Sequence, residues 1–387
     1  MTTRTLILGG GFGGIATSVE LKRLLGDGHE VVLVDRKPEF TMGLRKLWGL
    51  VGHGSTAQGS RPRGLLVAHG VSVVEEDVLA IDPAARAAET SSGRLDGDHL
   101  VIALGAVSRP DLVPGLAEHG YDIWALAGVP AAAEALGRFD GGRLLIVIAG
   151  APYPCPPAPY ECAFHLHEHL RDRGLRDRSD LAVVTVQPML MPNAGWAGSE
   201  WMAGQLAERD IAQRIGAKVE RVETDRVVLA DGREEPFDLL LTVPPHRPPA
   251  VVTDSGLVAG HGWIGVDPGT LATSSDGVFA IGDVNLIPLA NGLPLPKAGV
   301  MAELQGLRVA RAIAAELGVG EPPKPFDGTG YCPVEVGPNA GAMVRGDWYA
   351  EPDPLVKIDG PSTAYATEKR AFEATRLEAW FGRWPGA

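Results

Sequence analysis

One cysteine stands where the sequence predicts that a buried strand gives way to a helix. The stretch GAPYPCPPAPYECAF, residues 150–164, follows the apolar run RLLIVIA and places Cys155 among five prolines. A helix that begins near Ala158 directs its positive N-terminal end at this turn, which favours the thiolate form of Cys155. Thiolates carry out nucleophilic and redox chemistry, whereas the alternative use of such a cysteine is as a small buried apolar residue. That alternative is our prediction for Cys162, inside the helix.

A second candidate site lies at the N-terminus. Gly9, Gly11 and Gly14 form a G-x-G-x-x-G pattern between the short strand TLIL and a helix, and Asp35 ends the next strand. In this arrangement the glycines allow a tight turn, close approach of a pyrophosphate and close helix packing, while the acidic residue accepts ribose hydroxyls. A simple glycine turn is the alternative, but the strand, helix and acidic residue in register predict dinucleotide binding.

A distant segment adds an acidic group to the same ligand. In DGVFAIGDVN a strand over residues 278–281 is followed by Gly282 and Asp283. The carboxyl ends of strands in an open α/β sheet form the crevice where ligands bind. Two distant segments that serve one ligand favour an extended dinucleotide, so the sequence predicts FAD, although an ordinary Gly-Asp turn is the alternative.

The bulk composition limits the classes of function. The 387 residues are 45% hydrophobic, which is enough for two or three domains, and the net charge of -13 argues against a nucleic-acid partner. The N-terminal residues lack a signal-peptide pattern, and no apolar run is long enough to span a membrane, so we expect a cytoplasmic protein. Three cysteines do not form a disulfide framework, and we predict no metal site.

The predicted second α/β domain lacks a nucleotide loop of its own. After Gly150 no G-x-G-x-x-G pattern follows, and Pro152, Pro154, Pro156 and Pro157 remove backbone N–H donors from the place where a pyrophosphate would need them. We therefore expect weak or absent binding of NADH and NADPH.

Several segments carry a family resemblance. HLVIALGAVSRPDLVPGL and GVFAIGDV resemble segments of flavoproteins with two dinucleotide-binding domains, in which the aspartate corresponding to Asp283 contacts FAD. GAPYPCPPAPYE, VPPHRPP, LPKAGVMAELQG and GYCPVEVG resemble the sulfide:quinone oxidoreductase and flavocytochrome c sulfide dehydrogenase flavoprotein family.

This resemblance implies a fold and a domain plan. The fold is α/β, with two Rossmann-like dinucleotide-binding domains, the second inserted in the first, and a small C-terminal region. The FAD-binding domain comprises residues 1–108 and 250–330. The inserted domain, without a glycine loop, comprises residues 109–249, and the remaining strands and an amphipathic helix comprise residues 331–387.

The resemblance also implies the site. Cys155 and Cys332 correspond to the family's redox pair beside the flavin; sulfide attacks one sulfur to give a persulfide, and the flavin takes up two electrons. Lys297, before a long helix, corresponds to a lysine near the isoalloxazine, where it stabilises negative charge on the reduced flavin. The alternative for Lys297 is a solvated lysine at a helix start.

Some features depart from the family pattern. No cysteine occurs in residues 1–154, so the FAD is expected to be noncovalent, and lengthening of a polysulfide on a third cysteine is in doubt. Quinone-reducing relatives often have a histidine in the region where this chain has Asn193, which weakens the assignment of quinone as acceptor.

The C-terminal stretch has two interpretations. Aromatic residues and basic residues alternate with acidic ones in TAYATEKRAFEATRLEAWFGRWPGA, residues 363–387. One interpretation is an interfacial helix that brings the protein to the inner face of a membrane. The other is a helix docked on the protein or in a homodimer interface, which we favour because Glu368, Glu373 and Glu378 offset the basic charge.

The function predicted from these features is FAD-dependent oxidation of sulfide, or of a persulfide or thiol, through Cys155 and Cys332, with electrons passed to a quinone or another carrier. Two alternatives stay open: a type II NADH dehydrogenase-like flavoprotein, and a flavin-binding interaction protein without catalysis.

Overall fold

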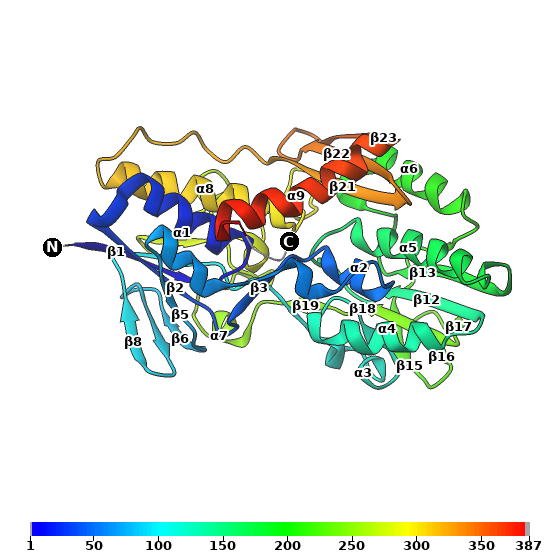
Figure 1. The fold of residues 1–387 in the computed structure, drawn as a ribbon. Coiled ribbons are helices and arrows are strands. Elements are labelled where there is room, and N and C mark those ends of the chain that lie inside the picture. The colour runs from blue at the N-terminus through cyan, green and yellow to red at the C-terminus, as the bar shows by residue number, and fades with distance from the viewer. Residues whose placement is uncertain (1, 384–387) are drawn as a thin grey trace.

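The computed structural model describes residues 2–383 as two α/β lobes side by side (Figure 1). The left lobe in that view holds the N-terminus, and the right lobe holds the middle of the sequence. The C-terminal helix α9 (Thr363–Phe381) runs from strands over the right lobe back to helix α1 of the left lobe.

The first lobe is built on a parallel sheet of strand order β20-β9-β1-β2-β5. Its strands are β1 (Thr3–Leu8), β2 (His29–Val34), β5 (Ser72–Val74), β9 (His99–Ile102) and β20 (Val278–Ala280). Alternate side chains face opposite ways along a strand. Ile7 of β1 packs with helices α1 (Phe12–Leu25) and α8 (Gly299–Glu316), while Leu6 and Leu8 pack on the other face. An antiparallel sheet of β6 (Val78–Asp82), β7 (Ala87–Thr90) and β8 (Gly93–Asp96) and helix α7 (Ala250–Thr253) contribute to that face.

The second lobe repeats this plan. Its main sheet has the order β11-β18-β12-β13-β14, formed by β11 (Tyr121–Asp122), β12 (Gly142–Ile148), β13 (Ser179–Thr185), β14 (Ala212–Arg214) and β18 (Leu239–Val243). Ile146 of β12 packs on the side of helices α4 (Val129–Arg138), α5 (Ala158–Asp172) and α6 (Gly195–Ala207). Val147 packs on the opposite side with β15 (Val219–Val222) and β16 (Arg226–Leu229), and β17 (Glu234–Pro236) pairs with β16.

The chain passes between the lobes at one short antiparallel pair. Val107–Ser108 (β10) pairs with His246–Arg247 (β19), so the outgoing and the returning segments lie side by side. The smaller elements of the two lobes are β3 (Glu39–Thr41), α2 (Arg45–Leu50), β4 (Ser60–Pro62) and α3 (Leu116–His119).

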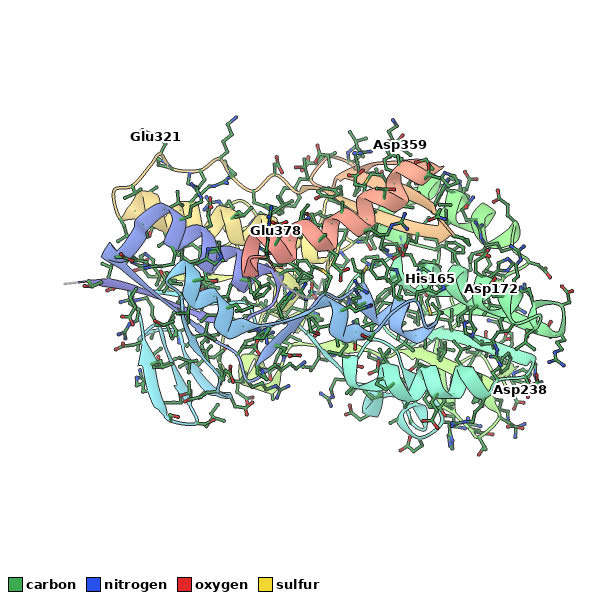
Figure 2. The ribbon with its side chains drawn as sticks, viewed as in Figure 1. His165, Asp172, Asp238, Glu321, Asp359 and Glu378 are labelled. Atoms are coloured by element: carbon green, nitrogen blue, oxygen red, sulfur yellow. The ribbon has the colours of Figure 1, made fainter. Side chains whose placement is uncertain are left out.

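The C-terminal region forms its own antiparallel sheet. It consists of β21 (Thr329–Gly337), β22 (Ala340–Asp347) and β23 (Leu355–Ser362), followed by α9. In β23, whose sequence is LVKIDGPS, no residue is fully buried, although Val356 and Ile358 pack against the core. Side chains fill the space between this sheet and the lobes, with His165 in the interior and Glu321 and Asp359 at the periphery (Figure 2).

Two of the aromatic side chains that would anchor α9 as an interfacial helix are packed inside the protein. Trp380 and Phe381 are buried, and Trp380 makes edge contacts with the rings of Phe12 and Phe40. Since these rings pack on the first lobe, they are not free to enter a bilayer. Trp384, the last aromatic residue of the stretch, lies outside the described residues. Among the helices formed by residues 2–383, not one combines the length and hydropathy needed to span a bilayer.

Candidate active site

The glycine turn of the first lobe has the shape that a dinucleotide requires. Gly9 adopts a left-handed conformation (φ +104°), and a Cβ there would lie 2.3 Å from the backbone oxygen of Ala103. A Cβ on Gly14 would lie 1.9 Å from the oxygen of Gly9, so only glycine allows α1 to pack this closely. A Cβ on Gly11 would meet nothing within 4 Å. The protein thus leaves open space at the residue where a pyrophosphate would approach.

Asp35 lies at the end of β2 beside this turn. Its Oδ2 accepts a hydrogen bond from the Gly10 N–H at 2.7 Å, and its Oδ1 accepts one from Lys37 N–H. The guanidinium of Arg63 lies 3.4 Å from Oδ2 and also donates to the backbone of Gly10. An ionised carboxylate has about four acceptor positions, so Asp35 keeps capacity for ribose hydroxyls.

Asp283 contributes a carboxylate, a hydrogen-bond acceptor, from a segment that is distant in the sequence. Burial raises the pKa of its carboxyl group, and within residues 2–383 no hydrogen bond to that carboxylate is present. The residue is half-buried, so its carboxylate keeps acceptor positions that a ligand can use. Gly282 is held by a bond from its N–H to Gln305 of α8. The residues present therefore fit FAD: a glycine turn with open space, and two carboxylates at strand ends.

Lys297 is buried, which contradicts the alternative of a solvated lysine. Only 5% of the residue is exposed, and Nζ donates to the backbone oxygens of Asp283 (2.8 Å) and Asn285 (2.6 Å). The ammonium also lies 3.7 Å from the centre of the Trp263 ring. Burial lowers the pKa of Lys297 to about 8. The side chain thus fixes the turn that carries Asp283.

The proline-rich turn of the second lobe is tied to the same segment. Cys155 has a left-handed backbone conformation (φ +58°), which is uncommon for a residue with a side chain. Its N–H donates to the backbone oxygen of Lys297 at 2.6 Å. Through this bond the turn that carries Cys155 lies against the segment that enters α8.

Cys155 and Cys332 meet, although 177 residues separate them in the sequence. Both are free thiols, partly exposed, and they lie within hydrogen-bonding reach of each other. The hydrogen bond from Cys332 lowers the pKa of Cys155 against the opposing effect of burial, and the same bond raises the pKa of Cys332. Of the two thiols, Cys155 is therefore the one that loses its proton more readily. Cys162, by contrast, is fully buried and burial raises its pKa, as expected of a packing residue.

A buried ionic cluster beside the cysteines was not identified from the sequence. Lys369 of α9 forms an ion pair with Glu161 of α5 and lies 3.7 Å from Glu335 of β21. Glu335 in turn accepts hydrogen bonds from Trp48 (2.7 Å) and contacts His165 at 3.2 Å. Although burial opposes it, the hydrogen bond from His165 and the charge of Lys369 lower the pKa of Glu335 to about 2.

The charges of this ionic cluster change the pKa of Cys155. The charge of Lys369 lowers the pKa of Cys155, as does that of Lys46, whereas Glu161 raises it. Glu161 stands within the CPPAPYE segment, which was the available signal for its role. Lys369 carried no signal, because in the sequence it is one of several basic residues of an amphipathic stretch.

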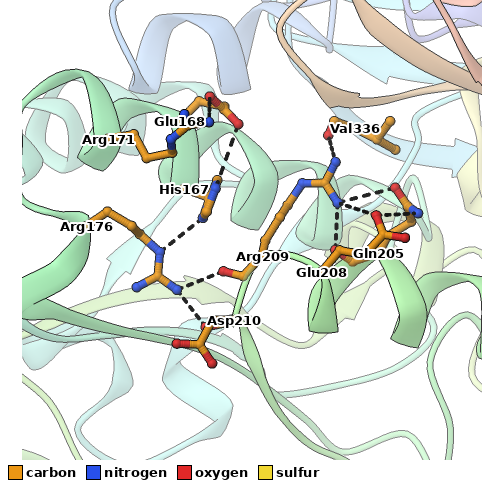
Figure 3. A network of polar contacts seen from close by, with 9 residues as sticks. All are labelled: His167, Glu168, Arg171, Arg176, Gln205, Glu208, Arg209, Asp210 and Val336. Carbon is orange, nitrogen blue, oxygen red and sulfur yellow. Dashed lines mark hydrogen bonds and ion pairs between the residues drawn. The ribbon is translucent and has the colours of Figure 1, made fainter.

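β21 is also anchored to the second lobe. Figure 3 shows Arg209, after α6, donating to the backbone oxygen of Val336 in β21 and to that of Gln205 in α6. Arg176 donates to the backbone oxygens of Arg209 and Asp210 and so fixes the segment that carries Arg209. These bonds fix the strand on which Cys332 lies relative to α6 and the segment that follows it.

Two adjoining hollows lie on the side of the proline-rich turn. The larger, of about 460 Å³, is lined by Gly150, Tyr153, Gln187 and Asn193 and by residues 293–297. It occupies the carboxyl ends of β12 and β13, where a Rossmann domain would bind a nucleotide. Among the described residues that line it, Lys297 is the one cation, and its ammonium is already bonded to two carbonyl oxygens. The lining therefore offers little to a pyrophosphate. Within residues 2–383 no group of three or more metal-ligating side chains is present.

The comparisons with known proteins agree with this geometry. A profile of the family described as pyridine nucleotide-disulphide oxidoreductase matches residues 3–306. The chain belongs to this family. It is an FAD-dependent oxidoreductase, as the sequence predicted.

Individual relatives indicate the branch of the family. The chain is 25% identical to the mitochondrial sulfide:quinone oxidoreductase of Mus musculus, over 90% of this chain and 78% of that protein. It is 28% identical to the sulfide-quinone reductase of Aquifex aeolicus, over 82% and 77% of the two chains. The solved structure of the Aquifex aeolicus sulfide:quinone oxidoreductase has a TM-score of 0.87 at 24% identity, covering 98% of this chain and 92% of that chain, and so shows the same fold. Quinone-linked NADH dehydrogenases are also among the relatives. The resemblance inferred from the sequence segments is thus confirmed.

Proposed function

We propose that this flavoprotein oxidises sulfide, or a persulfide or thiol, through Cys155 and Cys332 and passes the electrons through noncovalently bound FAD to a quinone or another carrier. One observation carries the proposal. The two cysteines converge from distant segments, with Cys155 in the turn after β12, at the carboxyl edge of the second lobe's sheet, where α/β folds bind ligands.

The division of labour between the cysteines follows from their protonation. Cys332 lines the smaller hollow, so it is the sulfur that an incoming nucleophile meets. When sulfide attacks the disulfide form at Cys332, the leaving electron pair stays on Cys155, whose lowered pKa makes it the better leaving thiolate. A second sulfide takes the outer sulfur of the Cys332 persulfide as hydrogen disulfide and leaves Cys332 as a thiolate. Re-forming the disulfide from the two thiolates then gives up two electrons, which FAD would accept when bound. Lys369 and Lys46 stabilise the negative charge on Cys155.

The electron acceptor of this protein is less well specified than its electron donor. Asn193 donates through Nδ2 to the backbone oxygen of Pro294, so it holds a loop and provides no acid or base for quinone chemistry. Quinone as acceptor is supported by the names of the relatives and requires the protein to meet a membrane surface. With Trp380 and Phe381 buried, that contact, or a homodimer, has to use other residues than the aromatic face of α9.

Anaerobic titration with sodium sulfide tests the proposal. We expect the flavin absorbance to bleach, or a long-wavelength charge-transfer band to form, at stoichiometric sulfide. Repeating the titration with a soluble quinone should restore oxidised flavin. Bound FAD with no spectral response to sulfide would instead support a flavin-binding interaction protein.

The second candidate is a type II NADH dehydrogenase-like activity, which the NADH-linked relatives keep in view. Rapid mixing with NADH or NADPH separates it from sulfide oxidation. The proline-rich turn leads us to expect slow, non-saturating reduction. Fast saturable reduction would overturn the proposal. Flavin that stays with the protein pellet after acid precipitation would contradict noncovalent binding.

A further inference from the structure

The turn that carries Cys155 holds a strained backbone conformation. Cys155 lies in the left-handed region (φ +58°), which costs free energy for a residue with a side chain and persists only where the surroundings fix it. Within the turn, the Ala158 N–H donates to the backbone oxygen of Cys155 at 3.0 Å, and the Tyr153 hydroxyl donates to that of Pro156 at 3.1 Å. A third backbone oxygen, that of Pro154, receives its donor from outside the turn.

That donor is Trp124, in the segment after β11. Its indole N–H donates to the Pro154 oxygen at 2.9 Å, and its ring makes an edge contact with Tyr153 at 6.2 Å between the centroids. Trp124 is only 7% exposed. Asp122 fixes its backbone, since Oδ1 accepts hydrogen bonds from the N–H groups of Trp124 (2.8 Å) and Ala125 (2.9 Å). A rigid indole is thus held against the proline-rich turn.

Lys46 is attached to the same tryptophan from the N-terminal part of the sequence. Its Nζ donates to the backbone oxygen of Trp124 at 2.7 Å and lies 5.6 Å from the centre of the Trp124 ring. The helix α2 that carries Lys46 packs on α4 and α5, and its Leu47 and Leu50 are buried in the core of the second lobe. Lys46 therefore has a fixed place beside Trp124, although the two are distant in the sequence.

Several groups act on the sulfur of Cys155, and Lys46 is one of them. The titratable groups that face this sulfur are Cys332, Glu161, Lys369, Lys46 and Tyr153. The hydrogen bond from Cys332 has the largest effect and lowers the pKa of Cys155, while burial opposes it. Glu161 raises this pKa and its ion-pair partner Lys369 lowers it, so these two charges partly offset each other. The charge of Lys46 lowers the pKa of Cys155 as well.

Three negative groups support the protonated form of Lys46. Burial has the largest effect on the pKa of Lys46 and lowers it. The charges that act against burial are those of Cys155, Asp122 and Asp283, while that of Lys37 adds to it. Within residues 2–383 Lys46 forms no ion pair, so no contacting carboxylate offsets its charge at the sulfur.

We propose that Trp124 and Lys46 are positioning residues for Cys155: Trp124 holds the strained turn through the Pro154 oxygen, and Lys46, anchored on Trp124, supplies a positive charge to the thiolate. This inference rests on the proposed function and adds two residues to its machinery. Lys46 is bonded to the backbone of the same residue whose side chain holds the turn. The orientation of the sulfur and its charge environment are therefore set from one point.

The first test measures the effect of the Lys46 charge on Cys155 without depending on catalysis. The reduced holoprotein is alkylated with iodoacetamide over a range of pH, and modification of Cys155 is followed by peptide mass spectrometry. Lys46→Met should raise the pH midpoint of Cys155 alkylation by about one unit, a roughly tenfold loss of thiolate below the midpoint, because a nearby opposite charge favours the ionised form. Lys46→Arg should restore most of this shift.

The control for this test is Lys357→Met, which removes an exposed lysine of β23. It should leave the midpoint unchanged. A midpoint in Lys46→Met equal to that in Lys357→Met would overturn the role of Lys46. Equal shifts in Lys46→Met and Lys46→Arg would overturn the role of its charge.

The second test measures the position of the sulfur. Trp124→Phe keeps an aromatic ring beside Tyr153 but removes the donor to the Pro154 oxygen. The equilibrium between the two thiols and their disulfide is measured in glutathione buffers, in which oxidised glutathione takes up the two electrons and two protons. Because a looser turn holds Cys155 less often against Cys332, we expect the equilibrium constant for disulfide formation to fall by about 2–10-fold, the range of one hydrogen bond.

The control is Trp201→Phe, which alters a tryptophan of α6 that packs on the same core. It should leave the disulfide equilibrium unchanged. An equilibrium constant in Trp124→Phe equal to that in Trp201→Phe would overturn the role of Trp124.

A third measurement connects both residues to the reaction. Flavin reduction by sulfide is followed by stopped-flow absorbance, and we expect Lys46→Met and Trp124→Phe each to be about 3–10-fold slower than the unaltered protein. If sulfide fails to reduce the flavin of the unaltered protein while the alkylation midpoint and the glutathione equilibrium still depend on these residues, the proposed function fails and this inference stands. Unchanged rates in both variants of a protein that responds to sulfide would overturn the inference.

Discussion

The turn between β1 and α1 and the turn between β12 and α5 both join a parallel strand to a helix, but they carry different chemical groups. In the first lobe, three glycines bring α1 within a few residues of β1 and leave open space at Gly11. In the second lobe, nine residues separate β12 from α5, prolines remove N–H donors, and the left-handed residue is Cys155 rather than a glycine. The first turn offers backbone donors to an anion, and the second offers a sulfur atom. The comparison teaches that the same kind of strand-to-helix turn can present different chemical groups in the two lobes.

The largest expected effect comes from removing the sulfur of the second turn. Cys155→Ser or Cys332→Ser should slow sulfide-driven flavin reduction by roughly 10³-fold or more, the scale of losing a nucleophile from a catalytic unit. FAD should stay bound, because neither residue belongs to the first turn. Stopped-flow absorbance measures the rate, and the flavin-to-protein absorbance ratio measures retention. Normal turnover in either variant would show that the cysteines are not the reacting groups, and the proposed difference between the two turns would fail.

The next largest effect is expected from removing the positive charge of Lys369, which lies near Cys155 in the second turn. Lys369→Met leaves Glu161 and Glu335 buried without their cation, and breaking a buried pair in this way costs about 3–5 kcal/mol of unfolding free energy. It should also raise the pKa of Cys155, because the charge of Lys369 lowers it. Denaturant unfolding and the pH dependence of Cys155 alkylation measure the two effects. Lys357→Met, at an exposed position of β23, is the control. A stability loss without a change in Cys155 titration would limit Lys369 to a structural role.

Lys297 joins the two turns and gives a pH-dependent effect. Its pKa is about 8 in the fold and 10.5 in the unfolded chain, so the unfolded state binds more protons between these pH values. Stability due to Lys297 should therefore rise from pH 8 to pH 10.5, by up to about 3 kcal/mol. The difference between the unaltered protein and Lys297→Met in denaturant unfolding isolates this contribution from other groups. A difference that does not vary over this pH range would show that Lys297 titrates normally.

The smallest effect sharpens the description of the first turn. Gly11→Ala adds a methyl group that meets no protein atom within 4 Å, so the fold should keep its stability. The same methyl group would occupy space that the pyrophosphate approaches, so FAD affinity should fall by about 10–100-fold, or 1.4–2.8 kcal/mol. Gly14→Ala serves as the contrast, because its Cβ collides with the Gly9 oxygen and should destabilise the protein itself. FAD titration and thermal unfolding of both variants separate the two cases. Unchanged affinity in Gly11→Ala would mean that the turn does not face the cofactor.

What the sequence could predict depended on local pattern. Gly9, Gly11, Gly14 and Asp35 lie in one β-α-β unit, so their spacing alone predicted their arrangement. The meeting of Cys155 and Cys332 was implied only by family resemblance, since spacing over 177 residues carries no geometry. The partners of Lys369 were not predictable at all, because they come from α5 and β21 and are joined only by tertiary packing. The two hollows could not be predicted from the sequence either, because their volume depends on side chains from several elements at once.

The helix α9 has a consequence for how the molecule unfolds. Along one helix, Lys369 pairs with Glu161 of the second lobe, and Trp380 packs on Phe12 and Phe40 of the first. Two lobes that each have a core of their own would ordinarily melt in separate steps. Clamped by one shared helix, they should melt together in a single calorimetric transition. A chain shortened before residue 363 should show two transitions, and the sulfur pair would come apart with the lower one.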